Sequence, residues 1–254
     1  MLVAAALVPD SALLVPGAGG VADPGSSLRQ AALMATWEAV HGECRVVVVA
    51  PGPRDRRLGA AARASLGAAG VPDEALAWRT PAQLPDRPAR SETGPVAGVS
   101  ASVALFLLAQ HHVAAAEVVE VDTLQHDVGR AGQLRVLGRR LADEGPTALV
   151  VVGSASARHG PDAPLADDHR APGYDDALLG DLADGTAQAR ARLAALDPEL
   201  AAELAVTGWA PWQVLLGAAG EDEFDARLVQ RGVLAGASHA TVTWRRPVPT
   251  EPSR

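Results

Sequence analysis

Residues 149–160 read LVVVGSASARHG, an apolar strand that runs directly into small and polar residues. Four consecutive apolar residues, Leu149–Val152, are typical of a strand that is buried on both faces. In an α/β protein, ligands bind beyond the carboxyl ends of such strands. Arg158 and His159, which follow this strand, are therefore expected at the ligand-binding edge of a sheet.

Similar strands recur along the chain and alternate with helical segments. The other predicted strands are Leu2–Val8, Arg45–Ala50, Val118–Val121, Phe224–Leu234 and Ser238–Trp244. The first predicted helix starts at Ser26 or Ser27 and ends near His41. The other predicted helices span Leu58–Leu66, Val99–His112, Gly129–Glu144 and much of the region from Asp175 to Gly217. This alternation indicates a mostly parallel sheet covered on both faces. We therefore predict a three-layer α/β/α sandwich with an antiparallel C-terminal strand pair.

The length and composition set the domain organisation. The chain has 254 residues, of which 48% are hydrophobic, and one α/β domain can hold a core of that size. We predict a single domain over residues 1–245 and a flexible, proline-rich tail over 246–254. Residues 79–98 contain four prolines and few apolar residues, which favours a surface loop.

The charge pattern excludes several classes of partner. The net charge is −8, with no basic run and no interleaved aromatic residues, which argues against nucleic acid binding. For Arg54, Arg56 and Arg57 we favour a solvated loop over an anion contact.

Cys44 is the single cysteine, so no intrachain disulfide forms. Leu2–Val8 is too short for a signal peptide, and no apolar run reaches the roughly 18 residues of a membrane span. We expect a cytoplasmic protein.

Three local motifs have simpler interpretations than a functional one. Residues 17–22 fit a dinucleotide-binding G-x-G-x-x-A pattern, but Asp23-Pro24-Gly25 breaks the helix that this motif needs, so a turn is favoured. Neither Ser154 nor Ser156 has glycine on both sides at the spacing of a nucleophile elbow. The seven histidines show no metal-binding spacing. His239 shares a strand face with two threonines, which suits a polar outer face or a cavity wall.

The order of these segments resembles the superfamily of class III extradiol ring-cleavage dioxygenases, in particular their catalytic subunits. This superfamily includes the catalytic subunit of protocatechuate 4,5-dioxygenase and also Memo, and the likeness is greatest to its actinobacterial branch. It spans about residues 1–244 and is carried by Pro9–Pro16, Val151–Arg158, Ala171–Tyr174, Leu196–Leu204, Trp212–Leu215 and Gly236–Trp244.

The resemblance implies an Fe(II) site whose ligands look substituted. In the family, one His follows the first strand, a second follows a later strand, and a Glu lies near the carboxyl end; a third His acts as acid and base. The three His positions correspond here to Asp10, Gly52 and Ala157, and no Glu stands clearly in the last strand. A facial triad needs two imidazoles and one carboxylate. We therefore expect no metal and no cofactor at the family position.

These observations predict a divergent dioxygenase-like protein that has lost its iron site. It would bind or transform an anionic or aromatic small molecule without metal. Assembly into a homo-oligomer is compatible with the sequence. His159, Arg158 and Asp10 are the candidate catalytic residues, as proton carrier, anion clamp and base; an Arg158–Asp10 ion pair is the structural alternative. The candidate binding residues are Ser154, Ser156, Gly52 and Asp175. Two alternatives stay open: an active Fe(II) dioxygenase with rearranged ligands, and a non-catalytic interaction protein.

Overall fold

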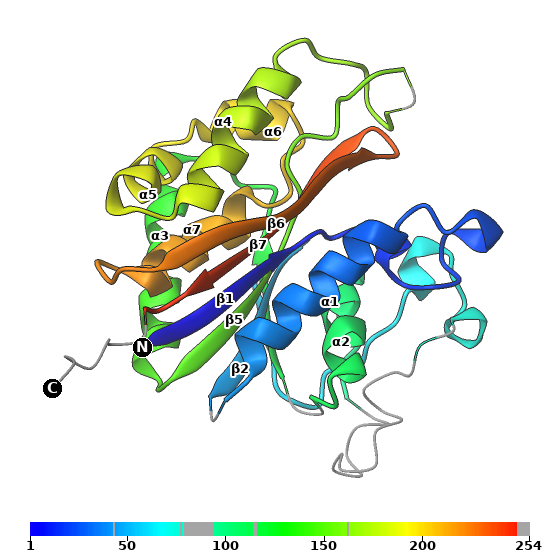
Figure 1. Cartoon of the computed structure of the whole chain (residues 1–254), viewed down its shortest axis with the longest axis horizontal. Helices are drawn as coiled ribbons and strands as arrows, with labels where there is room; N and C mark the ends of the chain where they lie inside the picture. Colours follow the sequence, from blue (N-terminus) through cyan, green and yellow to red (C-terminus); the bar gives the residue numbers. More distant parts are fainter. Residues whose placement is uncertain (43, 77, 79–93, 114–115, 162, 248–254) are drawn as a thin grey trace, which may run out of the picture.

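The computed structural model describes residues 1–42, 44–76, 78, 94–113, 116–161 and 163–247. Its centre is one sheet of seven strands in the order β3-β4-β2-β5-β1-β7-β6 (Figure 1). The strands are β1 (Leu2–Val8), β2 (Arg45–Gly52), β3 (Arg56–Leu58), β4 (Glu117–Asp122), β5 (Thr147–Val152), β6 (Asp225–Leu234) and β7 (Ala237–Arg245). The four strands predicted to share a sheet do so.

The centre of the sheet is parallel and its flanks are antiparallel. β1 pairs in parallel with β5, and β2 pairs in parallel with both β5 and β4. β7 pairs antiparallel with β1 and with β6, so the C-terminal hairpin completes the sheet as predicted. All six residues of β5 are buried because it lies between two parallel neighbours. The carboxyl ends of β1, β2, β4 and β5 consequently meet at one edge, here called the carboxyl edge; the opposite one is the amino edge.

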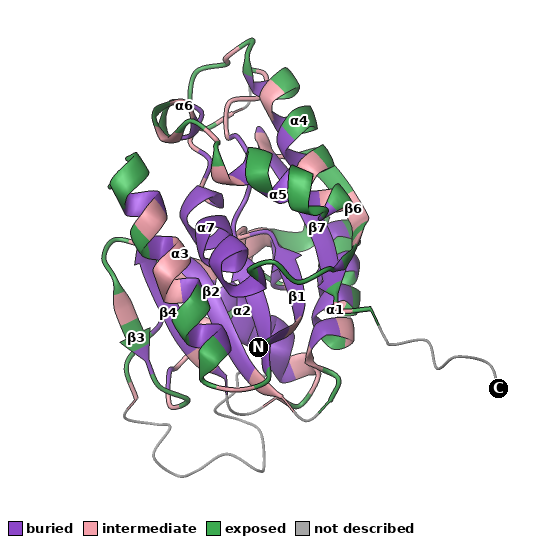
Figure 2. Cartoon of the chain, turned by 90° about the vertical axis from the view of Figure 1, so that its left-hand side faces the viewer, coloured by how far each residue is buried: buried purple, intermediate pink, exposed green. Residues whose placement is uncertain are grey.

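Helices cover both faces of the sheet, which gives the predicted three layers (Figure 1). The seven α-helices of the described residues are α1 (Ser26–Val40), α2 (Val99–Gln110), α3 (Val128–Asp143), α4 (Ala171–Asp184), α5 (Ala187–Ala194), α6 (Pro198–Glu203) and α7 (Trp209–Ala219). One apolar core joins the sheet to α1 and α2, and the other joins it to α3, α4, α5 and α7. Figure 2 shows the central strands buried between these two layers, whereas the edge strands β3 and β6 are partly exposed.

The predicted helix over Leu58–Leu66 is wrong. Only Leu58 belongs to a regular element, the short edge strand β3, which pairs antiparallel with β4. Residues 59–66 form a turn and an isolated bridge from Arg63 to Val96. The solvated-loop interpretation is also wrong for Arg56, which bonds the buried carboxylate of Glu120, and for Arg57, which pairs with Glu117 and Glu144. Arg54, in contrast, is exposed in a bend before β3. These three glutamates lie far along the sequence, so local periodicity could not reveal the pairing.

Element boundaries otherwise differ from the prediction by a few residues. Arg45–Ala50 extends to Gly52, and α4 begins at Ala171 rather than at Asp175. Most of the predicted 79–98 loop, and most of the predicted tail, lie outside the described residues. Within the described part of the chain, no helix has the length and apolar character needed to cross a membrane.

Candidate functional site

The carboxyl ends of β1 and β5 are held side by side. The Gly153 amide donates to the Val8 carbonyl at 3.0 Å, which continues the parallel pairing past both strands. A Cβ at Gly153 would lie 2.3 Å from the Cα of Gly208, so only glycine permits this approach to the start of α7. Asp10 and Ser154, which leave the two strands, are thereby brought together.

The first polar network joins Asp10, Ser154 and His239. The Ser154 hydroxyl donates to the Asp10 carboxylate at 2.5 Å, and its Oγ lies 2.7 Å from Nδ1 of His239. Ser154 and His239 are buried, whereas Asp10 is half-buried. A serine hydroxyl carries one proton, so donation to Asp10 requires His239 Nδ1 to donate in turn. The network is thus a continuous path for hydrogen bonds from β7 to the end of β1.

Burial sets the charge state of His239. Desolvation lowers the pKa of His239, while the Asp10 charge and the hydrogen bond that the protonated ring can donate to the Leu234 backbone act in the opposite direction. Burial has the largest effect, because the imidazolium loses its hydration without gaining a directly bound carboxylate. The neutral imidazole is therefore favoured near neutral pH.

The second polar network joins Asp175 of α4 with Ser156 and His159. The Asp175 carboxylate accepts from the Ser156 amide at 3.0 Å, from the Ser156 hydroxyl at 2.7 Å and from Nε2 of His159 at 2.7 Å. An ionised carboxylate only accepts hydrogen bonds, so the proton of the His159 ring is held on Nε2. Nδ1 of His159 has no hydrogen-bond partner among the described residues.

A cavity of about 300 Å³ opens beside this second network. Its wall is formed by His159 and Asp175 on one side and by the β6–β7 hairpin on the other, where Ser238 and Arg231 contribute. Arg231 is more than half exposed and forms an ion pair with Asp176, which also lines the cavity. Leu179 and Val233 add apolar surface. The cavity therefore offers an apolar wall, one guanidinium and one imidazole.

The two networks lie on opposite faces of β7. Between them, the loop after β5 pairs with β7 through its backbone: the Ala155 amide donates to the Ser238 carbonyl, and the Ser238 amide donates to the Ser156 carbonyl. Neighbouring residues of a strand point to opposite faces, so Ser238 faces the cavity while His239 faces Ser154. The same backbone ladder positions both networks.

Arg158 and Gly52 occupy positions that sequence reasoning did not anticipate. The Arg158 guanidinium donates to the Glu203 carbonyl at 2.5 Å and to the Ala166 carbonyl at 3.0 Å, so it holds the surrounding loops together. It forms no ion pair with Asp10 and does not line the cavity. Gly52 lies against the Glu120 side chain, which a Cβ would approach to 3.0 Å. The structure brings together Ser156, His159 and Asp175, and separately Asp10 and Ser154.

Sequence reasoning missed three residues of the site. The sequence places His239 on a polar face or a cavity wall, but its bond to Ser154 depends on a pairing between β1 and β7 that spans most of the chain. Ser238 and Arg231 belong to no motif, so the sequence does not single them out. The alternation of Ser238, His239 and Ala240 along β7 is the sequence pattern that could have indicated a polar face on this strand.

The positions of the family's iron ligands do not fit an Fe(II) site here. Gly52 and Ala157 carry no donor atom, and the Asp10 carboxylate accepts the Ser154 hydroxyl. Asp10 and His239 supply one carboxylate and one imidazole, and a facial triad needs one imidazole more. Among the described residues, no group of three or more His, Cys, Asp or Glu side chains is arranged to hold a metal ion.

Comparisons with known proteins inform only the fold. No family model and no curated protein matches the chain. Among solved structures, it is similar to the uncharacterized protein JW3007 from Escherichia coli K12, with a TM-score of 0.51 and 16% sequence identity. That match covers 95% of this chain and 99% of the other. The likeness shows the fold. At this identity it carries no statement about chemistry.

Proposed function

We propose that this protein binds a small anionic molecule in the cavity beside His159 and exchanges a proton with it. The observation that carries the proposal is the buried Asp175 carboxylate, which bonds Nε2 of His159 at 2.7 Å at the wall of the cavity. A carboxylate that fixes one ring nitrogen leaves the other as a proton acceptor. His159 is then the general base, and Asp175 is its positioning residue.

Arg231 provides the charge complement for the ligand. Its guanidinium lies at the cavity and, among the described residues, pairs only with the exposed Asp176, so a carboxylate or enolate of the ligand can compete for it. Leu179 and Val233 offer an apolar surface for an aromatic ring. A cavity of about 300 Å³ is at the lower end of the usual range for ligand sites, which favours a ligand of one ring.

We further propose that the chain is a divergent extradiol dioxygenase-like protein that works without iron. The ordered motifs from Pro9 to Trp244 support the relationship, and the absence of donor atoms at Gly52 and Ala157 supports the loss of the metal. Metal analysis of the purified protein tests this directly, and less than stoichiometric iron is expected. Near-equimolar iron, with catechol cleavage that a chelator abolishes, would instead support the rearranged dioxygenase.

Benzoate is a suitable probe for the cavity because it is both aromatic and anionic. Titration calorimetry should show 1:1 binding to the wild-type protein, weakened at least about tenfold in Arg231→Met, since loss of a charge-assisted hydrogen bond costs about 1.5 kcal/mol or more. His169→Asn serves as the control for the His159 variant described next, because His169 lies on the same loop between β5 and α4 and its side chain is 95% exposed.

His159→Asn separates binding from proton exchange. This variant should retain benzoate binding within a few-fold but lose any proton uptake that accompanies binding, measured in buffers of different ionisation enthalpy. Wild-type protein that fails to bind benzoate or related aromatic acids would contradict the proposed site and favour the interaction-protein alternative.

A further inference from the structure

A second cavity, of about 320 Å³, lies at the amino edge of the sheet, far from the site described above. It is formed where α4 turns into α5 and where β6 begins, and it is lined by Gly185, Thr186, Ala187, Arg190, Glu223 and Asp225 among others. Asp225 pairs with Arg245, which pairs with Ala4 near the start of β1, so the cavity belongs to the edge opposite His159.

Arg190 is a buried cation without a carboxylate partner. The residue is only 7% exposed, and its Nη1 donates to the Gly185 carbonyl at 2.8 Å. Its guanidinium lies 6.0 Å from the centre of the Phe224 ring. Among the described residues, no Asp or Glu forms an ion pair with it. The guanidinium lines the cavity, so its remaining N–H groups are within reach of an anion bound there.

The start of α5 borders the same cavity through Thr186 and Ala187. Thr186 caps the helix by accepting from the Ala189 amide at 3.2 Å, which leaves the amides of Ala187 and Gln188 in the first turn without an intrahelical partner. The amino end of a helix attracts negative charge. Arg190 and the first turn of α5 thus border the same cavity.

The rim of the cavity has the opposite charge. Glu221, Glu223 and Asp225 line the cavity, are exposed, and take part in no ion pair within the described part of the chain. Three unpaired carboxylates repel an anion that carries no positive group. They attract an ammonium group that extends outward from the anion bound at Arg190.

The geometry points to a binding site for a small zwitterion of the α-amino-acid class. The carboxylate of the ligand bonds the Arg190 guanidinium and the first-turn amides of α5, and its ammonium group faces the rim carboxylates. This site is separate from the proposed proton-exchange site and does not depend on it. A purely structural role for Arg190, which joins the end of α4 to α5 through Gly185, is the competing outcome of the test.

Glycine, acetate and methylammonium form a matched set of probes, because the last two are halves of the first. In an NMR titration of the amide signals, glycine should shift Thr186, Ala187 and Gln188, with a Kd on the order of 1 mM. Acetate and methylammonium should each bind at least about tenfold more weakly. Equal binding of acetate and glycine, or no shifts at these residues, would overturn the proposal.

Variants locate the site. Arg190→Met should abolish the glycine shifts, and Arg190→Lys, which retains the charge but loses the planar fork, should weaken binding about tenfold. Glu223→Gln should weaken glycine binding but not acetate binding. Arg192→Met is the control, since Arg192 lies on the same helix but pairs with Asp181 on the surface. Glycine binding that is unchanged in both Arg190 variants would contradict the assignment, and binding in His159→Asn should equal that of the wild type.

Discussion

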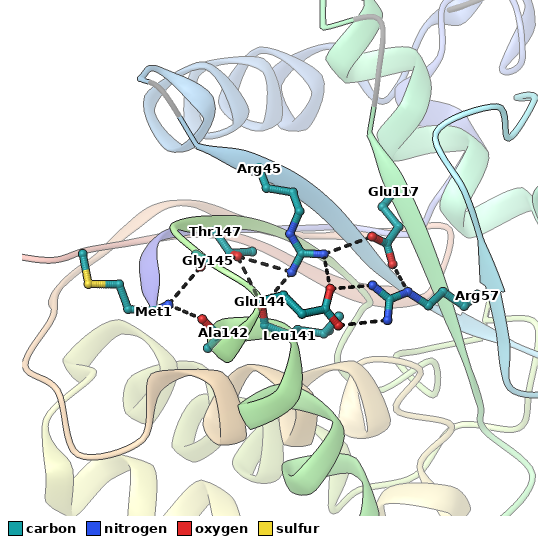
Figure 3. Close-up of polar contacts among 9 residues, drawn as sticks. All are labelled: Met1, Arg45, Arg57, Glu117, Leu141, Ala142, Glu144, Gly145 and Thr147. Atoms are coloured by element: carbon teal, nitrogen blue, oxygen red, sulfur yellow. Dashed lines mark hydrogen bonds and ion pairs between the residues drawn. The ribbon is translucent and has the colours of Figure 1, made fainter.

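The two edges of the sheet use polar residues in opposite ways. At the amino edge, Arg45 and Arg57 pair with Glu117 and Glu144 in a cluster of four alternating charges (Figure 3). At the carboxyl edge, short side chains and histidines form buried hydrogen-bond networks. In the first arrangement every charge is matched by a partner; in the second, a ring nitrogen is left for a ligand.

The difference follows from side-chain length and exposure. Arg57 is 51% exposed and Glu144 37% exposed, so water screens their attraction and the pairs hold the surface in place without strict geometry. The guanidinium of Arg57, assisted by Arg45, lowers the pKa of Glu144 and keeps it ionised. Asp175, by contrast, is buried, and its three hydrogen bonds fix the neighbouring groups. The amino-edge cluster is suited to stability and the carboxyl-edge networks to chemistry.

The largest effect is expected from Gly153→Ala, which breaks the support of the carboxyl edge. The added Cβ would lie 2.3 Å from the Gly208 Cα, and the Gly208 backbone cannot move away without disturbing the start of α7. We expect destabilisation by about 3 kcal/mol in urea unfolding. Gly180→Ala in α4, where the new Cβ meets no atom within 4 Å, should instead stabilise the protein by about 0.5 kcal/mol. Equal effects of the two substitutions would contradict the close approach.

Asp175→Asn should have the next largest effect. The amide group replaces an acceptor with a donor that faces Ser156 and His159, which costs about 2 kcal/mol of unfolding free energy. Asp176→Asn, one residue along and exposed, should change stability by less than about 0.5 kcal/mol. A loss at Asp175 as small as that at Asp176 would remove the distinction between the buried network and the surface.

The pH dependence of stability tests the first network. Burial lowers the folded-state pKa of His239 below about 6.5, the value of an unfolded chain. Between these two pKa values the unfolded state binds more protons, so the stabilisation is present above about pH 6.5 and is lost as the pH falls towards the folded-state pKa. His239→Gln should reduce this slope. His169→Gln, at a side chain that is 95% exposed, should not. An unchanged slope in His239→Gln would show that His239 is not buried as a neutral ring.

Arg57→Met at the amino edge should have the smallest effect, less than about 1 kcal/mol, and the difference from wild type should shrink further in high salt. Arg54→Met, at an exposed residue without an ion pair among the described residues, is its control. An effect above about 2 kcal/mol would mean that the surface cluster, rather than the buried networks, is the more important polar structure.

The same contrast explains what the sequence could predict. The apolar composition of runs such as Leu149–Val152 indicates that they are buried strands, so the sheet and its parallel centre could be predicted. Ser156, His159 and Asp175 lie within 20 residues of one another, and their position after a buried strand was visible. The partner of Ser154 on β7, and the glutamate partners of Arg57, lie 85 and 60 or more residues away. Such contacts depend on strand order, which periodicity does not reveal.

The central claim is that Asp175 holds the His159 proton on Nε2 and leaves Nδ1 to the ligand. Long-range ¹H–¹⁵N NMR of the histidine rings measures this directly. The account predicts a protonated Nε2 and an unprotonated Nδ1 in His159, an Nδ1 shift that changes when benzoate binds, and loss of the tautomer preference in Asp175→Asn. A His159 ring protonated at Nδ1, with shifts that benzoate leaves unchanged, would contradict it.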